Sequence, residues 1–178
     1  MKKNYTLSVF TDNRAGLLNR ITIAFTRRKI NIESLIASES EVEGIYRYTI
    51  VINETEEAVA KVTKQLEKQV EVYKAFYHAD EEVVSQEIAL YKVATDILTT
   101  GGKAEKLIRH HNARLLSVER DFAVIEKTGY KEDTEKLFED LEPFGILEFA
   151  RSGRVAISKP MKELRSYLEE LKIEMTNI

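Results

Sequence analysis

Hydrophobic residues change their spacing several times along the first half of the chain, and each change predicts a new element. Tyr5, Leu7 and Val9 alternate with other residues, as in a strand with one buried face. Apolar residues then recur at helical spacing from about Arg14 to Lys29. The predicted order is strand 5–10, helix 14–29, strands 32–38 and 46–52, helix 54–66 and strand 70–77. This βαββαβ order packs two helices on one face of an antiparallel sheet.

The same order of elements begins again after the charged junction at residues 80–82. Strand 87–95, a helix through 104–111, a hairpin of strands 114–118 and 122–125, a helix around 137–141 and strand 146–150 follow. Pro143 and Gly145 end the last of these helices. The sequence therefore predicts an α+β protein of two ferredoxin-like units in tandem, residues 1–79 and 80–159. Pro160 opens a terminal helix over 160–178, which either covers its own domain or docks on a partner.

One local signal predicts where the second helix of the first unit begins. Asn53 is followed three residues later by Glu56, which is the spacing of a capping box. We therefore expect Asn53 to cap this helix.

Composition narrows the class of protein. The chain has 178 residues, 43% of them hydrophobic, with a net charge of −3 and no cysteine. This charge argues against a broad electrostatic grip on nucleic acid, and the absence of cysteine excludes disulfides and thiolate metal sites. No apolar run approaches the length that spans a membrane, and no apolar signal segment precedes the first strand. We expect a soluble, cytoplasmic protein.

No set of residues predicts catalysis. His110 and His111 are neighbours on a predicted helix, so their side chains diverge by about 100° and cannot share one metal ion. The carboxylates lie in runs typical of helix starts and solvated faces. The glycine pair at 101–102 lacks the following Lys-Ser/Thr of a phosphate loop. We predict a protein that is not an enzyme and that binds no metal or cofactor.

RNA recognition is an alternative on topology alone, since some RNA-binding modules share the βαββαβ order. Tyr46 and Tyr48 lie on the third strand at the period that stacks bases. However, the segment lacks the basic-Gly-aromatic opening of that motif, and the tyrosine face continues into Ile50 and Ile52. We interpret this face as packing, in the core or at a subunit contact, and expect a protein partner on the opposite sheet face.

The turn after the first strand is the best candidate for a binding site. The strand stops at Asp12, Gly16 follows, and a helical pattern begins at once. Such a helix start leaves backbone N–H groups unpaired, and these groups with the helix dipole attract a small anion such as a carboxylate. Gly16 lets a ligand approach the backbone because it has no Cβ. We expect Asn31, which opens the second strand, to lie beside this turn.

Two motifs carry a resemblance to a known family. Residues 13–20 read Asn-x-x-Gly-Leu-Leu-x-Arg and residues 31–35 read Asn-Ile-Glu-Ser-Leu, which is similar to the signature of ACT domains, modules that bind amino acids in metabolic enzymes. The second of these motifs, together with Glu-Phe-Ala-Arg-Ser-Gly at 148–153, resembles the small regulatory subunits of acetolactate (acetohydroxyacid) synthase. The resemblance covers about residues 4–159.

The resemblance implies a function. Such a subunit forms a homodimer through its ACT domain, activates the catalytic subunit and makes it sensitive to feedback inhibition by a branched-chain amino acid, usually valine. Thiamine diphosphate, FAD and magnesium would belong to the catalytic subunit. Carried over by position, the effector-binding residues are Asn13, Arg14, Ala15, Gly16, Leu17, Asn31 and Ile32. Leu17 and Ile32 are the candidates for apolar contact with the effector.

Two positions depart from the family pattern. Many members have Gly where this chain has Lys29, at the place where the first helix is expected to end in a left-handed conformation. A lysine there costs about 1 kcal/mol, or else the turn differs. Ala15 replaces a common Pro or Ser, which changes the stiffness of the loop. Two alternatives stay open, an activating module that senses no effector and an ACT-domain regulator of another amino-acid enzyme.

Overall fold

The chain forms two compact units. The computed structural model describes residues 1–99, 102–159, 166 and 169. Among the described residues, Met1–Val84 and those from Ala156 to Lys159 belong to the first unit, and Ser85–Val155 make the second. The sequence pattern predicted the boundary between the two units between residues 79 and 80. The terminal helix predicted for 160–178 lies outside the described residues, apart from two positions.

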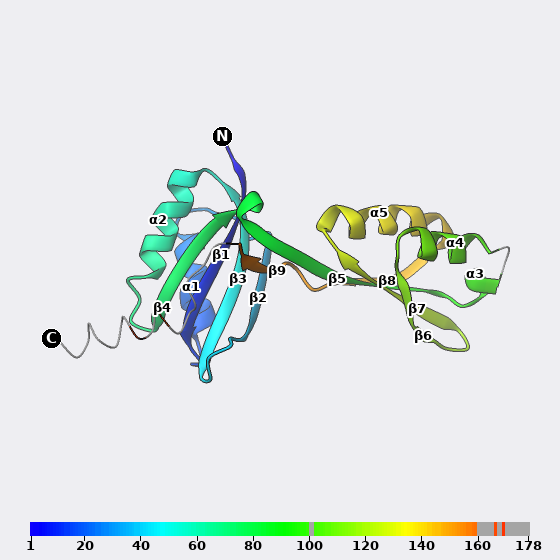
Figure 1. Ribbon diagram of the computed structural model, residues 1–178, viewed down its shortest axis with the longest axis horizontal. Helices are drawn as coiled ribbons and strands as arrows, with labels where there is room; N and C mark the ends of the chain where they lie inside the picture. Colours follow the sequence, from blue (N-terminus) through cyan, green and yellow to red (C-terminus); the bar gives the residue numbers. More distant parts are fainter. Residues whose placement is uncertain (100–101, 160–165, 167–168, 170–178) are drawn as a thin grey trace. The chain divides into compact units, whose positions relative to one another are not determined.

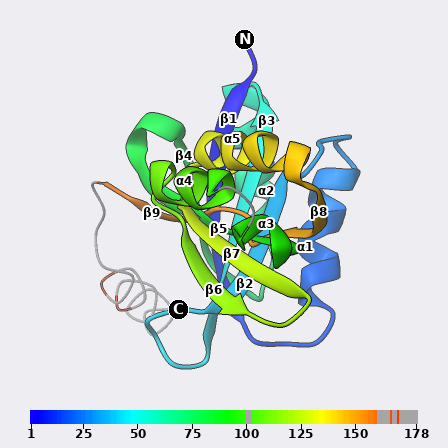
Figure 2. The same ribbon diagram turned by 90° about the vertical axis from the view of Figure 1, so that its right-hand side faces the viewer.

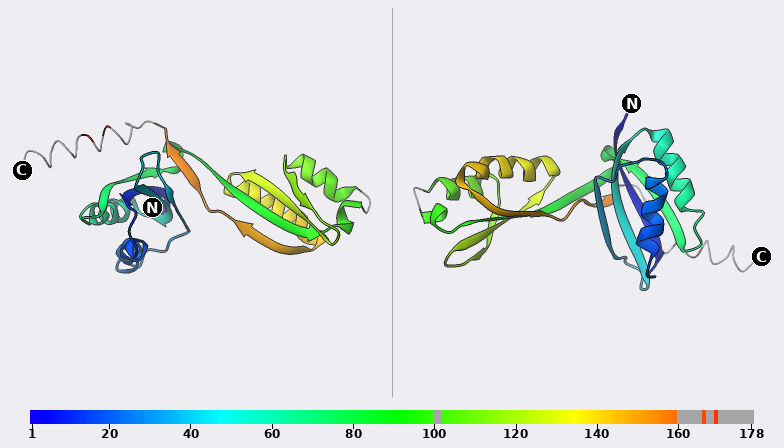
Figure 3. Two further views of the ribbon diagram at one scale, coloured as in Figure 1. Left: turned by 90° about the horizontal axis from the view of Figure 1, so that it is seen from below. Right: turned by 180° about the vertical axis from the view of Figure 1, so that it is seen from behind.

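The first unit has the predicted order of elements (Figure 1). Its four strands form an antiparallel sheet in the order β2-β3-β1-β4. Helices α1 and α2 cover one face of this sheet (Figure 3, right). The elements are β1 (Lys3–Asp12), α1 (Leu17–Thr26), β2 (Ser34–Glu39), β3 (Ile45–Glu54), α2 (Glu56–Leu66) and β4 (Val72–Ala79), followed by the short turn η1 (Asp80–Glu82).

The core of this unit lies between the sheet and the two helices. Tyr5, Leu7 and Val9 of β1 face it, as their alternation predicted. Tyr48 is buried there, and Tyr46 packs partly buried against the same cluster. These tyrosines are therefore packing residues, as the sequence pattern predicted.

The opposite face of the sheet is covered in part by the chain itself. Arg47 Nη2 on β3 donates hydrogen bonds to Ser8 Oγ at 2.9 Å and to the carbonyl oxygen of Ala156 at 2.6 Å. Its guanidinium group lies over the ring of Phe10, 5.5 Å from the ring centre. The prediction that a partner protein covers this face is thus incomplete, because the segment that begins at Ala156 returns to it.

The start of α2 differs from the prediction. Thr55 is the N-cap residue, and its hydroxyl accepts a hydrogen bond from the N–H of Ala58 at 3.4 Å. Asn53 instead donates its side-chain amide to Asn4 of the neighbouring strand at 2.7 Å. The prediction that Asn53 caps the helix is wrong, because β3 continues two residues further than the local pattern indicated.

The second unit repeats the topology of the first, with strand order β6-β7-β5-β8 (Figure 2). A further strand, β9, pairs with β5, although its residues from Ala156 onward belong to the first unit. It was not predicted, since it has only four residues. The elements are β5 (Val83–Ala94), α3 (Asp96–Thr99), α4 (Lys103–His110), β6 (Arg114–Val118), β7 (Phe122–Gly129), α5 (Lys131–Leu141), η2 (Glu142–Phe144), β8 (Ile146–Arg151) and β9 (Val155–Ser158). Both predicted βαββαβ units are confirmed.

A buried polar cluster links β5, α5 and β8. Arg151 Nε lies 2.9 Å from Glu87 Oε1, an ion pair whose angle does not suit a hydrogen bond. The hydroxyl of Thr134 donates to the same carboxylate, and Tyr91 donates its hydroxyl to the carbonyl oxygen of Thr134 at 2.6 Å. Burial raises the pKa of Tyr91 well above its ordinary value. Arg151 of the 148–153 motif therefore connects β8 to β5 through this ion pair.

Candidate functional site

The turn between β1 and α1 has the backbone geometry expected of an anion-accepting helix start. Gly16 is the N-cap residue of α1, with φ 83° and ψ −7°, in the left-handed region. No side chain caps the helix. The N–H of Leu17 donates to the carbonyl oxygen of Arg14 at 3.3 Å, so the remaining N–H groups of the first turn are the ones left for solvent or a ligand. A Cβ built on Gly16 would meet no atom within 4 Å, so the space in front of this backbone is open.

One residue beside the turn, Tyr73, was not predicted as part of it. Tyr73 on β4 donates its hydroxyl to Asp12 Oδ1, and this hydrogen bond raises the pKa of Tyr73. Arg14 Nε lies 3.3 Å from the other carboxylate oxygen of Asp12. No local sequence pattern marks Tyr73, because its place beside the turn depends on the pairing of β4 with the end of β1, where Thr11 faces Val72. Asp12 fixes the start of the loop.

The side chains of the turn divide into an exposed and a buried group. Asn13, Arg14 and Ala15 are exposed, whereas Leu17 is only 2% exposed and belongs to the core. Ile32 packs partly buried against that core. The side chain of Leu17 is therefore committed to packing, and what this turn offers a ligand is its backbone.

The strand register places Asn31 far from the turn of the same chain. Ser34 pairs with Val51, which pairs with Thr6, whereas the turn begins six residues further along β1 at Asp12. Six residues of strand span about 20 Å. Helix α1, whose ten residues are about 15 Å long, runs from the turn toward the Asn31 end. Within one chain, the expectation that Asn31 lies beside the turn does not hold.

Asn31 is nevertheless exposed and held in place. Its Nδ2 donates to Glu33 Oε1 at 3.2 Å, which leaves its side-chain oxygen as an acceptor. The two halves of the predicted site are therefore both present on the surface, at opposite ends of α1.

The surroundings of the two histidines of the second unit are those of structural residues. His111 Nε2 lies 2.7 Å from Asp140 Oδ2, which links α4 to α5, and His110 is exposed. Among the residues that the structure describes, no three His, Asp or Glu side chains are grouped as a metal site would need. None of the described helices is long and apolar enough to cross a membrane.

Comparison with known proteins defines the class. The first unit matches the family model for the AHAS small subunit-like ACT domain over residues 7–74, which agrees with the fold and the open turn at Gly16. The second unit matches the model for the small subunit of acetolactate synthase over residues 86–160.

Relatives along the whole length settle the family. The chain is 37% identical to the acetolactate synthase small subunit of Bacillus subtilis over 97% of this chain and 99% of the relative. It is 37% identical to that of Mycolicibacterium smegmatis over 87% and 91%. The crystal structure of the Thermotoga maritima small subunit superposes with a TM-score of 0.81 at 28% identity, over 90% and 99% of the two chains. The chain belongs to the acetolactate synthase small-subunit family.

Proposed function

We propose that this chain is a regulatory subunit that activates the catalytic subunit of acetolactate synthase and confers feedback inhibition by a branched-chain amino acid, with valine the first choice. Family membership supports the regulatory role. The open, uncapped backbone at Gly16 carries the sensing part, because the effector's carboxylate suits the N–H groups and dipole of a helix start. Catalytic cofactors belong to the partner in this proposal.

The complete effector site needs a second copy of the chain. β2 lies at the edge of its sheet and pairs with β3 alone among the described strands. Its Glu39 end aligns with Tyr46 and Thr11, at the same end of the sheet as the turn. If two β2 edges pair antiparallel about a two-fold axis, the partner's β2 begins beside this Glu39 end. A partner copy would then bring its Asn31 toward this chain's turn.

This arrangement divides the contacts of a bound amino acid between two chains. The N–H groups of the turn at Gly16 receive the carboxylate, and the free side-chain oxygen of Asn31 from the other copy accepts from the ammonium group. Each dimer completes two equivalent sites, because a two-fold axis repeats every contact.

Thermal stability in the presence of valine tests the sensing turn. Valine at about 100 times its dissociation constant should stabilise the wild-type unit by about 2.7 kcal/mol. Gly16→Asp should abolish this shift, because the new carboxylate occupies the N–H groups and repels the ligand. Gly102→Asp is the matched control, since Gly102 is also a left-handed, uncapped N-cap glycine with open space beside it. This control should keep the wild-type response.

Mixed dimers test the division between chains. Homodimers of the Gly16→Asp chain and homodimers of the Asn31→Ala chain should each fail to bind valine. A heterodimer of the two chains should have one intact site. Heterodimers purified with two different tags should therefore bind one valine per dimer by calorimetry. Heterodimers that bind none would overturn the shared site. If valine, leucine and isoleucine all leave the stability of the wild type unchanged, effector sensing itself is wrong.

Reconstitution tests activation. The wild-type chain should raise the acetolactate synthase activity of the catalytic subunit, and valine should reduce the activity of the complex. Activity that rises but resists valine would leave an activator without sensing. Activity that does not rise would refute the regulatory role.

A further inference from the structure

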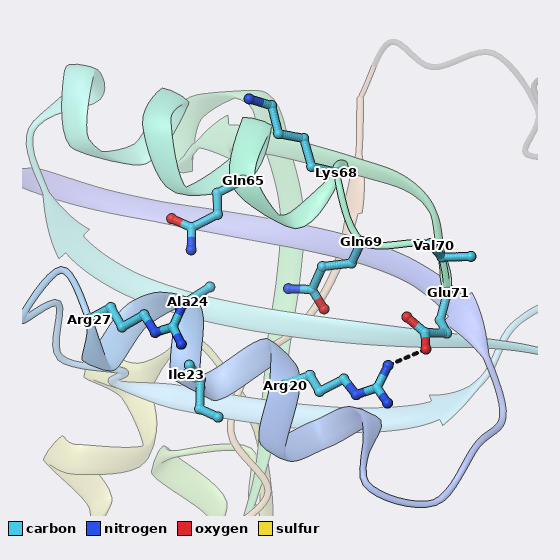
Figure 4. A pocket seen from close by; sticks show the side chains of 9 residues that line it. All are labelled: Arg20, Ile23, Ala24, Arg27, Gln65, Lys68, Gln69, Val70 and Glu71. Atoms are coloured by element: carbon cyan, nitrogen blue, oxygen red, sulfur yellow. Dashed lines mark hydrogen bonds and ion pairs between the residues drawn. The ribbon is translucent and has the colours of Figure 1, made fainter.

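A groove on the outer side of the first unit has no role in the proposed effector site. It lies between α1 and α2, has a volume of about 480 Å³, and reaches the loop between α2 and β4 (Figure 4). The groove adjoins the effector turn at one end, where the N–H of Asp12 donates to the carbonyl oxygen of Glu71 at 3.1 Å, but none of the predicted effector-binding residues lines it. Its lining residues are Arg20, Ile23, Ala24, Arg27, Gln65, Lys68, Gln69, Val70 and Glu71.

The groove is cationic although the whole chain has a net charge of −3. Arg20, Arg27 and Lys68 line it, against one carboxylate, Glu71. Figure 4 shows Glu71 paired with Arg20. Arg27 and Lys68 form no ion pair with any residue that the structure describes. The charge balance of the groove therefore favours an occupant with carboxylates.

The same groove exposes apolar side chains. Val70 is 95% exposed, and Figure 4 shows it pointing away from the helices, while Ile23 is also exposed on α1. Gln69 Oε1 is buried and has no hydrogen-bond partner in the described part of the chain. An occupant with N–H or O–H donors would satisfy this oxygen, and an occupant with apolar side chains would cover Val70.

Apolar and cationic residues together fit a polypeptide better than a small anion. A small-anion site encloses its ligand in buried donors, whereas here the cations lie on exposed side chains, Arg20 within α1 and Arg27 and Lys68 just beyond the ends of α1 and α2. A groove between two helices is a common receptor for an amphipathic segment. We propose that this groove binds an acidic, amphipathic segment of the acetolactate synthase catalytic subunit. This docking site rests on the proposed regulatory function.

Charge reversal in the groove tests this docking. Arg27→Glu and Lys68→Glu should each raise by about tenfold the concentration of the chain that half-activates the purified catalytic subunit. Val70→Ser should weaken activation without lowering stability, because it removes an exposed apolar side chain. High salt should narrow the difference between the wild type and the charge variants.

Lys64→Glu is the matched control for these variants. Lys64 lies on α2, one turn before Lys68, but does not line the groove, and its reversal changes the net charge by the same amount. It should leave half-activation nearly unchanged. An equal loss in this control would show that general charge, and not the groove, sets binding. Unchanged half-activation in Arg27→Glu and Lys68→Glu would overturn the docking site.

Two further measurements separate the possible failures. The free variants should keep the wild-type valine shift and dimer mass, since Arg27, Lys68 and Val70 belong neither to the predicted effector-binding residues nor to β2. If the groove variants lose the dimer mass, the groove binds a second copy and the proposal is wrong. If the wild type itself fails to activate the catalytic subunit, the regulatory function fails first.

Discussion

Lys29 offers a direct test of backbone strain at the end of α1. It has a φ of 56°, in the left-handed region that an L-residue with a long side chain rarely adopts. The N–H of Lys29 bonds to the carbonyl oxygen of Thr26 at 3.0 Å, and that of Ile30 bonds to Phe25 at 3.1 Å. This pair of bonds is a Schellman motif, which places Ile30 in the core. The conformation predicted for this position is confirmed.

The structure sets the magnitude expected for Lys29→Gly. Left-handed backbone costs an L-residue about 1–2 kcal/mol, and glycine loses about 0.5–1 kcal/mol more entropy than other residues on folding. Lys29 is exposed and forms no ion pair within the described residues, so the substitution removes little else. We expect the first unit to gain about 0.5–1 kcal/mol in its free energy of unfolding.

Amide hydrogen exchange, followed by mass spectrometry on peptides of β1 and β3, measures this gain for the first unit alone. Asn112→Gly is the comparison, since Asn112 has a φ of 50° at the same place after α4. It should gain less in the second unit, because asparagine tolerates the left-handed region. Lys29→Ala should change little, as alanine keeps the strain. If Lys29→Ala stabilises as much as Lys29→Gly, the strain argument is wrong.

Two further variants test the second unit. Arg151→Met should lower the free energy of unfolding of this unit by about 3 kcal/mol in urea denaturation, because the carboxylate of Glu87 is left buried without its ion pair. Adding Glu87→Gln to Arg151→Met should recover part of this loss. A double variant that recovers nothing would contradict this cause. Hydrogen bonds from Thr128 and Arg114 hold the pKa of Glu126 below its ordinary value of 4.5. The stabilisation from Glu126 is therefore complete above pH 4.5 and is lost as the pH falls through the lower folded-state pKa. Glu126→Gln should flatten this acid limb, and an unchanged pH profile would refute the assignment.

Much of the fold follows from short-range patterns. The alternation of Tyr5, Leu7 and Val9 identified the face of β1 that packs in the helix-covered core, because strand side chains alternate between faces whatever the rest of the chain does. The βαββαβ order and its repetition followed in the same way. The left-handed position at Lys29 was also predictable, because helix ends impose local backbone rules.

Register and long-range partners needed the tertiary structure. No pattern within residues 31–35 says which residue of β3 faces Ser34, and that pairing is what separates Asn31 from the turn at Gly16. The hydrogen bond from Tyr73 to Asp12 and the ion pair of Arg151 with Glu87 each join residues distant in sequence.

The sequence by itself thus determined the strand-to-helix turn at Gly16, the repeated topology and the family motifs. Only the tertiary structure decided that one chain carries two separated halves of the proposed effector site. The physical reason is that hydrophobic period and helix-end chemistry act within a few residues. Strand register and ion pairing depend on what the whole chain brings together.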